Sequence, residues 1–281
     1  MREIRKIASA IAVIAVALTV PAAAEAQNAS DGWRFALTPY VWLPSISGTL
    51  KFKNPPGGAG SVNVDFDIGV DDYISDLNFA LMLTGEARKD RWSLATDVIY
   101  VDLSGDSSSV RSVNFGGTVV STTLNGRANY SLRGIVWTLA AGYEAVQTPA
   151  LSLDAFGGFR YVGVKASTSW QLAATITGPL GGSQVFPQSG SVSQSEDLLD
   201  GIVGVRGRIR LGEGGWSIPY YADIGTGSSN LTWQAVLGVA YGFGWGEVAL
   251  AYRYLHYDLS NDKLVQDLSF GGPQLGVTFR F

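Results

Sequence analysis

The sequence predicts an all-β fold: a transmembrane, antiparallel, up-and-down β-barrel of about ten strands. The first observation is the last stretch, 275–281, in which Leu275, Val277, Phe279 and Phe281 alternate with Gly276, Thr278 and Arg280. The second is a composition of 46% hydrophobic and 16% charged residues with 35 Gly. The third is that no apolar run beyond the N-terminal region reaches the ~18 residues of a spanning helix. A membrane chain without spanning helices must close its backbone hydrogen bonds in a barrel.

The N-terminal region has the pattern of a secretory signal peptide. Arg2, Arg5 and Lys6 precede an apolar run from Ile7 to Val20, and Ala24-Glu25-Ala26 forms a small-x-small cleavage site. The run is too short for a comfortable spanning helix. We therefore expect residues 1–26 to be a signal peptide and residues 27–281 to form one barrel domain.

Charge and cysteine content restrict the compartment and the partners. The formal net charge is −4 at pH 7, which argues against nucleic acid as a partner. The chain has no Cys, which suits an exported protein in an oxidising periplasm and excludes zinc–thiolate chemistry.

The first five predicted strands each alternate between an apolar, outward face and a small or polar, inward face. They span Trp33 to about Leu50, Leu77–Arg88, Arg91–Leu103, Ser131–Val146 and Leu151 to about Lys165. The charged residues of these strands lie on the inward face. The outward set includes Phe35, Leu37, Phe79, Leu81, Trp92, Leu94, Ile135 and Trp137.

The remaining five strands follow the same alternation. They span Leu198–Leu211, Trp216–Ile224, Leu231–Phe243, Glu247–Leu259 and Asp267–Phe281. In the first of them Val203, Val205 and Ile209 share one face, and Arg206, Arg208 and Arg210 share the other.

The connections divide into short and long ones. Short turns are expected at Lys89-Asp90, Gln147–Pro149, Gly212–Gly215 and Gly244–Gly246, and four of the five other connections are longer. This asymmetry is typical of short periplasmic turns and longer outer loops, with both termini in the periplasm. Residues 51–76, 104–130 and 166–197 are expected to be outer loops, the second of which could project as a hairpin. Gly178 to Glu196 has no core pattern. Eight or twelve strands also fit, because 104–130 and 166–197 could hide a hairpin.

Aromatic residues are expected in two belts at the membrane interfaces. Those of the periplasmic belt are Trp33, Trp92, Tyr143, Trp216 and Phe281, and those of the outer belt are Tyr100, Tyr161, Trp233 and Tyr254.

The inward parity predicts a charged lumen. It places in the interior Arg34, Glu86, Arg88, Asp97, Glu144, Asp154, Arg160, Arg206, Arg208, Arg210, Asp223, Arg253 and Arg280. One interpretation is a salt-bridged network that plugs the lumen. The other is a narrow, porin-like channel for small solutes, with a weak anion preference from the arginine excess.

Two further groups are candidate sites. One expected outer loop is acidic, with Asp65, Asp67, Asp71, Asp72 and Asp76. Clustered carboxylates could bind Ca²⁺ or Mg²⁺, but their spacing matches no EF-hand calcium loop. A solvated loop is therefore favoured, and no metal or cofactor is expected. The single His, His256, shares a strand face with Asp258, yet no G-x-S-x-G motif supplies a nucleophile. No catalytic residue is therefore expected, and an outer-rim hydrolase using His256 is the remote alternative.

The C-terminal segment resembles the signal by which bacterial outer-membrane β-barrels are handed to the barrel-assembly machinery, on Gly276, Phe279 and Phe281. Thr38–Pro44, Asp223–Trp233 and Ala251–Asp258 also resemble a group of poorly characterised proteobacterial outer-membrane barrels. The resemblance implies a location in the Gram-negative outer membrane, with membrane lipid and lipopolysaccharide as partners. It implies no activity. We expect a non-enzymatic barrel with a structural or surface-interaction role, the small-solute channel being the alternative.

Overall fold

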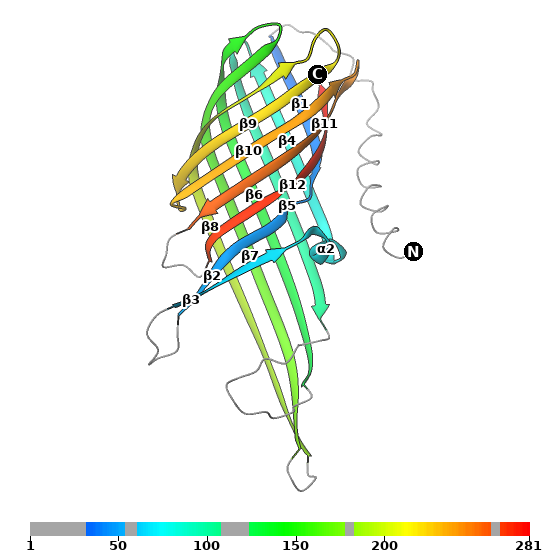
Figure 1. Ribbon diagram of the computed structural model, residues 1–281, viewed down its shortest axis with the longest axis vertical. Helices are drawn as coiled ribbons and strands as arrows, with labels where there is room; N and C mark the ends of the chain where they lie inside the picture. The colour runs from blue at the N-terminus through cyan, green and yellow to red at the C-terminus, as the bar shows by residue number, and fades with distance from the viewer. Residues whose placement is uncertain (1–31, 54–60, 108–123, 178–182, 260–264) are drawn as a thin grey trace.

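A closed ring of ten antiparallel strands forms the body of the protein, with two more strands outside the ring (Figure 1). The computed structural model describes residues 32–53, 61–107, 124–177, 183–259 and 265–281. The ring strands are β1 (Trp33–Trp42), β4 (Leu77–Lys89), β5 (Trp92–Ser107), β6 (Leu124–Gln147), β7 (Leu151–Thr177), β8 (Ser183–Arg210), β9 (Trp216–Gly227), β10 (Leu231–Gly242), β11 (Gly246–Asp258) and β12 (Val265–Arg280). Pairing of β1 with β12, from Ala36↔Arg280 to Trp42↔Gln274, closes the ring.

The predicted up-and-down barrel of about ten strands is thus confirmed. The ring has neither eight nor twelve strands. The predicted signal peptide, residues 1–26, lies outside the described residues. In the described part of the chain no helix is long and apolar enough to cross a membrane.

The first predicted strand is interrupted, and the loop after it contains a strand. β1 ends at Trp42, whose N–H points to the Met82 sulfur at 3.1 Å instead of a β4 carbonyl, and Pro44 has no N–H to donate. The chain continues along β12 as β2 (Ser45–Lys53). It then returns as β3 (Ser61–Ile68), which pairs with β2. A short helix α2 (Val70–Tyr73) and a 3₁₀ turn (Ile74–Asp76) lead into β4.

The prediction of irregular structure over 166–197 was wrong for 166–177 and 183–197, and residues 178–182 lie outside the described residues. β7 continues to Thr177 and β8 begins at Ser183, and the two pair without a register shift from Leu151↔Ile209 to Thr177↔Ser183. β6 joins them from Leu124, so the predicted loop 104–130 is also partly strand. In this projecting part Trp170, Leu172 and Ile176 share one parity of β7, but most of the other residues are Ser, Thr, Gln, Gly and Pro, so the apolar alternation is short. We call β6 up to Ser131, β7 from Ser167 and β8 up to Leu198 the outer ribbon.

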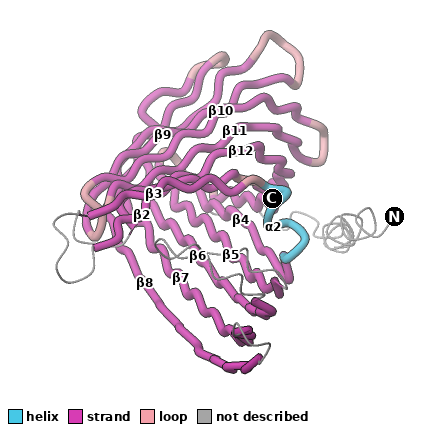
Figure 2. Tube along the Cα trace, turned by 60° about the horizontal axis from the view of Figure 1, so that its bottom comes forward, coloured by secondary structure: helices cyan, strands magenta, loops and turns pink. Residues whose placement is uncertain are grey.

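The two ends of the barrel differ. The end that carries the four short turns is here the inner end, and the end that carries the outer ribbon is the outer end. The inner turns lie where they were expected, with Asp90 (φ 52°) and Gly212 (φ 68°) in left-handed conformations. Figure 2, turned so that the outer end comes forward, shows β6, β7 and β8 extending from one side of the barrel.

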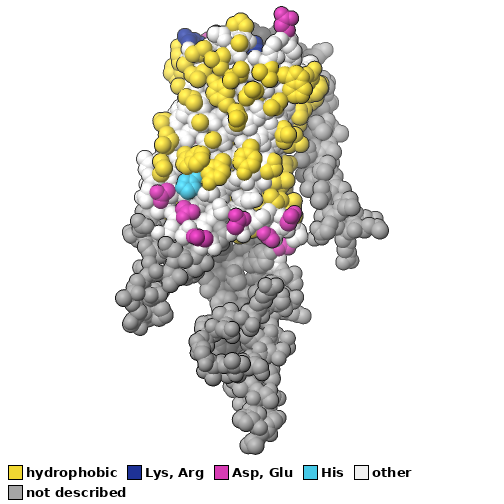
Figure 3. Space-filling model, in the orientation of Figure 1, with side chains coloured by type: hydrophobic (Ala, Val, Ile, Leu, Met, Phe, Trp, Pro, Cys, Tyr) yellow, Lys and Arg dark blue, Asp and Glu magenta, His cyan; other side chains and the backbone are white. Residues whose placement is uncertain are grey.

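The outside of the ring is apolar. Large hydrophobic side chains are exposed on most of the ring strands, among them Trp92 (63%), Leu237 (62%) and Leu250 (60%). On the face seen in Figure 3, hydrophobic side chains cover the wall and acidic side chains gather at its outer end. Predicted belt residues pair as aromatic neighbours: Trp92 with Tyr143 at the inner end and Trp233 with Tyr254 at the outer end, each at 5.0 Å between ring centroids. Such a surface suits lipid.

The inside of the outer half is also apolar, and it is filled. Buried Tyr40, Trp42, Ile99, Leu255 and Tyr257 form its centre. Lumen-facing residues that pack against this cluster include Met82, Val101, Leu198 and Phe270. Most charged lumen residues lie in the middle and the inner half; buried Asp200, which accepts from the Ser229 N–H at 2.8 Å, is an exception in the outer half.

Candidate functional site: the charged lumen

Strand parity brings the charged side chains to the interior. In β4, Thr84, Glu86 and Arg88 alternate with the lipid-facing residues, and in β8 Arg206 and Arg208 do the same. Because pairing registers fix the height of each residue, these groups collect in three clusters.

The first cluster, which we call the inner network, joins β4, β6, β7 and β8. Arg88 binds Asp154 through both terminal guanidinium nitrogens, binds Glu86 at 3.0 Å, and lies 3.8 Å from Glu144. Arg206 reaches Glu86 at 3.3 Å and Asp154 at 3.5 Å, and donates to the Ser93 hydroxyl at 3.0 Å. Two arginines thus share three carboxylates.

The second cluster centres on Glu247 of β11, which is 3% exposed. One Glu247 oxygen accepts from Arg208 at 2.7 Å, and the other accepts from Arg208 and, at 3.0 Å, from Arg280. Glu247 was missing from the predicted lumen set, although it shares the parity of Arg253 on the same strand. This shared parity in the sequence could have predicted that Glu247 faces the lumen.

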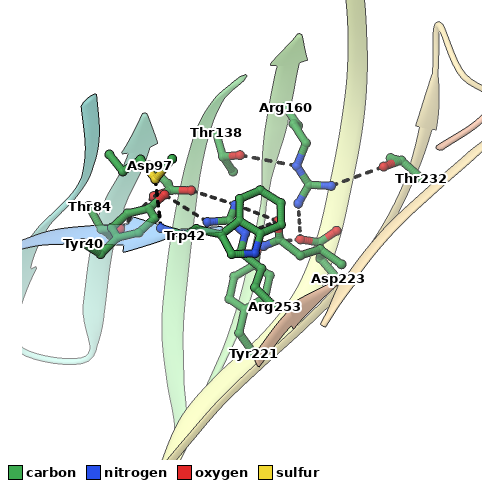
Figure 4. A network of polar contacts seen from close by, with 12 residues as sticks. Tyr40, Trp42, Thr84, Asp97, Thr138, Arg160, Tyr221, Asp223, Thr232 and Arg253 are labelled. Carbon is green, nitrogen blue, oxygen red and sulfur yellow. Dashed lines mark hydrogen bonds and ion pairs between the residues drawn. The ribbon is translucent and has the colours of Figure 1, made fainter. Parts of the chain in front are cut away.

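The third cluster, which we call the central network, includes Tyr40 and Trp42 of the apolar cluster and has two halves (Figure 4). In the first half, Arg160 is fully buried and pairs with Asp223. It also donates to the hydroxyls of Thr138 at 3.4 Å and Thr232 at 3.3 Å, and Tyr221 donates to the same Asp223 oxygen.

In the second half, Arg253 is 3% exposed and donates to Asp97, Tyr40 and Gln234 at 2.8–3.1 Å. The Tyr40 hydroxyl donates to Asp97 at 2.8 Å, so the aspartate is held from two sides. The guanidinium also lies 4.8 Å from the centre of the Trp42 ring. Every buried charge of the central network therefore has an opposite charge and neutral hydrogen-bond partners.

Two predicted lumen residues lie at the inner rim and outside these clusters. Arg34 is exposed beside its strand partner Arg88. Arg210 is exposed and donates to the Pro149 carbonyl at 3.4 Å. The neutral partners Tyr40, Gln234 and Thr232 were missed, because their role follows only from the packing of distant strands.

Some bonds of these networks cross the lumen. In the ring order, β5 and β11 are separated by four strand steps one way and six the other, and β4 and β8 by four and six. Arg253–Asp97 joins the first pair of strands and Arg206–Glu86 the second. In a ten-strand ring, partners this far apart face each other across the interior. The arrangement can hold opposite walls together and block the lumen with side chains.

The other predicted groups lie outside the lumen. His256 faces outward, with Nδ1 2.8 Å from the Ser269 hydroxyl and its ring beside Trp233. Asp65 accepts from Thr49 at 2.9 Å, and Asp72 accepts from the Gly69 N–H at 2.8 Å and caps α2. No group of three or more His, Asp or Glu in the described residues is arranged to hold a metal ion.

The predicted assembly-signal residues are at the seam that closes the ring. Phe281 exchanges two backbone hydrogen bonds with Phe35 of β1, and its side chain is exposed. Phe279 and Gly276 pair with Leu37 and Tyr40. The role of this segment in assembly stays a prediction.

A closed barrel with an apolar outside, short turns at one end and long strands at the other belongs to the outer-membrane class of β-barrels. Solved structures of this class are similar in fold. The outer membrane protease OmpT from Escherichia coli has a TM-score of 0.49 at 11% identity, covering 92% of this chain and 99% of that one. For the attachment invasion locus protein Ail of Yersinia pestis the TM-score is 0.28 at 11% identity, covering 89% and 99%. For the monoaromatic hydrocarbon channel CymD it is 0.35 at 12% identity, covering 89% of each.

No protein-family model matches the chain, and no curated protein matches it.

Proposed function

We propose that this protein is a non-enzymatic barrel of the bacterial outer membrane, with a closed lumen and a surface-interaction role carried by the outer ribbon. Bonds across the lumen support the closed state. Arg253–Asp97 and Arg206–Glu86 connect opposite walls at two heights, and an apolar cluster fills the interior above them. Membrane lipid and lipopolysaccharide would contact the apolar wall and the acidic outer end, and Gly276, Phe279 and Phe281 would direct assembly.

The outer ribbon supports the interaction role. The strands β6, β7 and β8 have 24, 27 and 28 residues, while about 9–11 residues suffice to cross a membrane. A barrel that served only as a wall would not need this extension.

Single-channel recording of protein refolded from inclusion bodies tests the closed lumen. We expect a silent bilayer, with folding shown by circular dichroism of the same sample. Discrete conductance steps would replace the proposal with the small-solute channel. A loss of anion preference in Arg206→Ala would then show that the lumen charges determine the ion selectivity of the channel.

One observation favours a second candidate, a hydrolase at the outer rim. The Ser269 hydroxyl lies 2.8 Å from His256 Nδ1 on the outward face, which is the distance of a nucleophile–base pair. Lipid esters in the outer leaflet would be the substrate class. A serine-directed fluorophosphonate would then label the wild-type protein and not Ser269→Ala. Ser47→Ala is the matched control, because Ser47 is the strand partner of Ser269 and lies one strand further from His256. Equal lack of labelling in all three proteins removes this candidate.

A further inference from the structure

One lateral edge of the outer ribbon has no partner among the described strands. Along residues 183–198, β8 pairs with β7 on one side and with no described strand on the other. Pairing with β9 begins only at Asp200↔Gly227. At ~3.3 Å per residue the free edge is about 50 Å long. Natural sheets rarely leave such an edge without a partner, because it is a template for another strand.

The groups that the edge presents can be identified from its first bonded residue. Leu199 accepts from the Ser228 N–H and donates to the Ser228 hydroxyl, both at 3.0 Å, so its backbone groups point to the β9 side. Backbone groups alternate between the two edges of a strand, and β8 has no register shift against β7. Every second residue from Asp197 out to Ser183 therefore turns its N–H and C=O to the free edge.

Pro187 agrees with this assignment. It has the parity of Leu199, so its missing N–H falls on the free edge and no bond to β7 is lost.

We propose that this edge pairs antiparallel with the same edge of a second copy of the chain; this rests on the proposed surface-interaction role. The edge is self-complementary when the two-fold axis passes through Gly190. Ser191 of one copy then lies opposite Ser189 of the other, and both residues turn their N–H and C=O towards the partner strand. Glu196 and Asp197 lie opposite Gln184 and Ser183 of the other copy, so no like charges meet. A self-pairing edge forms an isologous contact, which closes at two copies.

The symmetry decides where the second copy lies. The outer ribbon runs close to the long axis of the barrel (Figure 1). Antiparallel pairing of two identical strands needs a two-fold axis perpendicular to them, and this axis lies near the membrane plane. The two barrels are therefore in two facing membranes. Two copies in one membrane would bring the strands together pointing the same way with reversed sheet faces, which does not continue a ladder.

Vesicle clustering tests this inference. The protein is refolded into lipid vesicles that hold an entrapped ion-sensitive dye, and clustering is followed by light scattering. Wild-type vesicles are expected to cluster. Ser191→Pro removes one edge N–H from each copy at the centre of the pairing, and should reduce clustering at least tenfold. Ser191→Ala is the matched control, because it removes the hydroxyl and keeps the N–H, and should cluster like the wild type.

A peptide with the sequence of residues 183–197 should compete with clustering, and a scrambled peptide should not. The inference is overturned if wild-type vesicles stay dispersed, as they would if the edge served another protein, or if Ser191→Pro clusters like the wild type. The dye separates this failure from that of the proposed function. Dispersed vesicles that retain their ion gradient contradict only the self-pairing, whereas leaking vesicles contradict the closed lumen whether or not they cluster.

Discussion

At the scale of single residues, the central network is held by charges that cannot reach water. Arg160 and Asp223 have fully buried side chains. Removing one partner of such a pair typically costs about 3–5 kcal/mol, because the other charge stays buried, while replacing both by apolar residues costs much less. We expect Asp223→Ala to lose that much stability in urea unfolding of the refolded protein, and Arg160→Met/Asp223→Leu to recover most of it.

Arg133→Gln provides the control for that experiment. Arg133 pairs with Asp102 at 3.0 Å, but its side chain is 62% exposed, so its loss should cost about 1 kcal/mol or less. Equal losses in Asp223→Ala and Arg133→Gln would show that the central network does not hold the barrel together.

Tyr73 of α2 gives a pH-dependent prediction outside the membrane-spanning strands. Its hydroxyl donates to the Pro44 carbonyl at 2.7 Å, and burial raises the pKa of Tyr73 to about 12. A raised pKa favours the neutral phenol in the folded state, so this stabilisation is complete below pH ~10 and is lost as the pH rises towards ~12. The difference in ultraviolet absorbance between wild type and Tyr73→Phe should titrate in that window. A midpoint near 10 would mean that Tyr73 is not docked on Pro44.

At the scale of elements, the outer ribbon and the barrel should be energetically separate. The β8–β9 ladder stops at Asp200, and Ser167↔Ser193 is a pair within the ribbon. Replacing residues 168–192 by a short Gly-Ser turn removes only pairs outside the ring. We expect the urea midpoint of unfolding to stay unchanged within error while vesicle clustering is lost. A large drop in the midpoint would show that the ribbon supports the ring.

Comparing the ring with the outer ribbon shows which strands could be predicted from the sequence. Strands of the ring were predicted because lipid imposes an apolar side on each of them, as in the alternation of Val203 and Val205 with Gly204 and Arg206. Strand structure over 166–177 and 183–197 was missed because its apolar alternation, Trp170, Leu172 and Ile176, is short and most of the remaining residues are Ser, Thr, Gln, Gly and Pro. β3 was missed for a different reason: Val62, Val64 and Phe66 do alternate with polar residues, but the Gly- and Pro-rich stretch before them suggested a loop.

At the scale of the whole molecule, parity could predict which charges point inward but not which of them meet. Arg253 and Tyr40 are 213 positions apart and are brought together only when the ring closes with its particular stagger. Alternation of side chains along one strand contains no information on that stagger. The lumen charges were therefore largely predictable, whereas the cross-lumen bonds and their neutral partners, such as Gln234, were not.

Closure of the lumen then leads to the last prediction, that a water path can be opened by removing the side chains that cross it. Tyr40, Trp42 and Arg253 lie together at the middle of the lumen, and all three are buried. We expect Tyr40→Ala/Trp42→Ala/Arg253→Ala, if circular dichroism shows that it is folded, to give discrete conductance steps where the wild type is silent. The surviving Arg160, Arg206 and Arg208 would favour anions. Leu237→Ala/Leu250→Ala, which removes two exposed lipid-facing side chains, is the control and should stay silent. A silent triple variant would mean that the remaining lumen side chains, among them Arg160 and the inner network, are enough to seal the barrel.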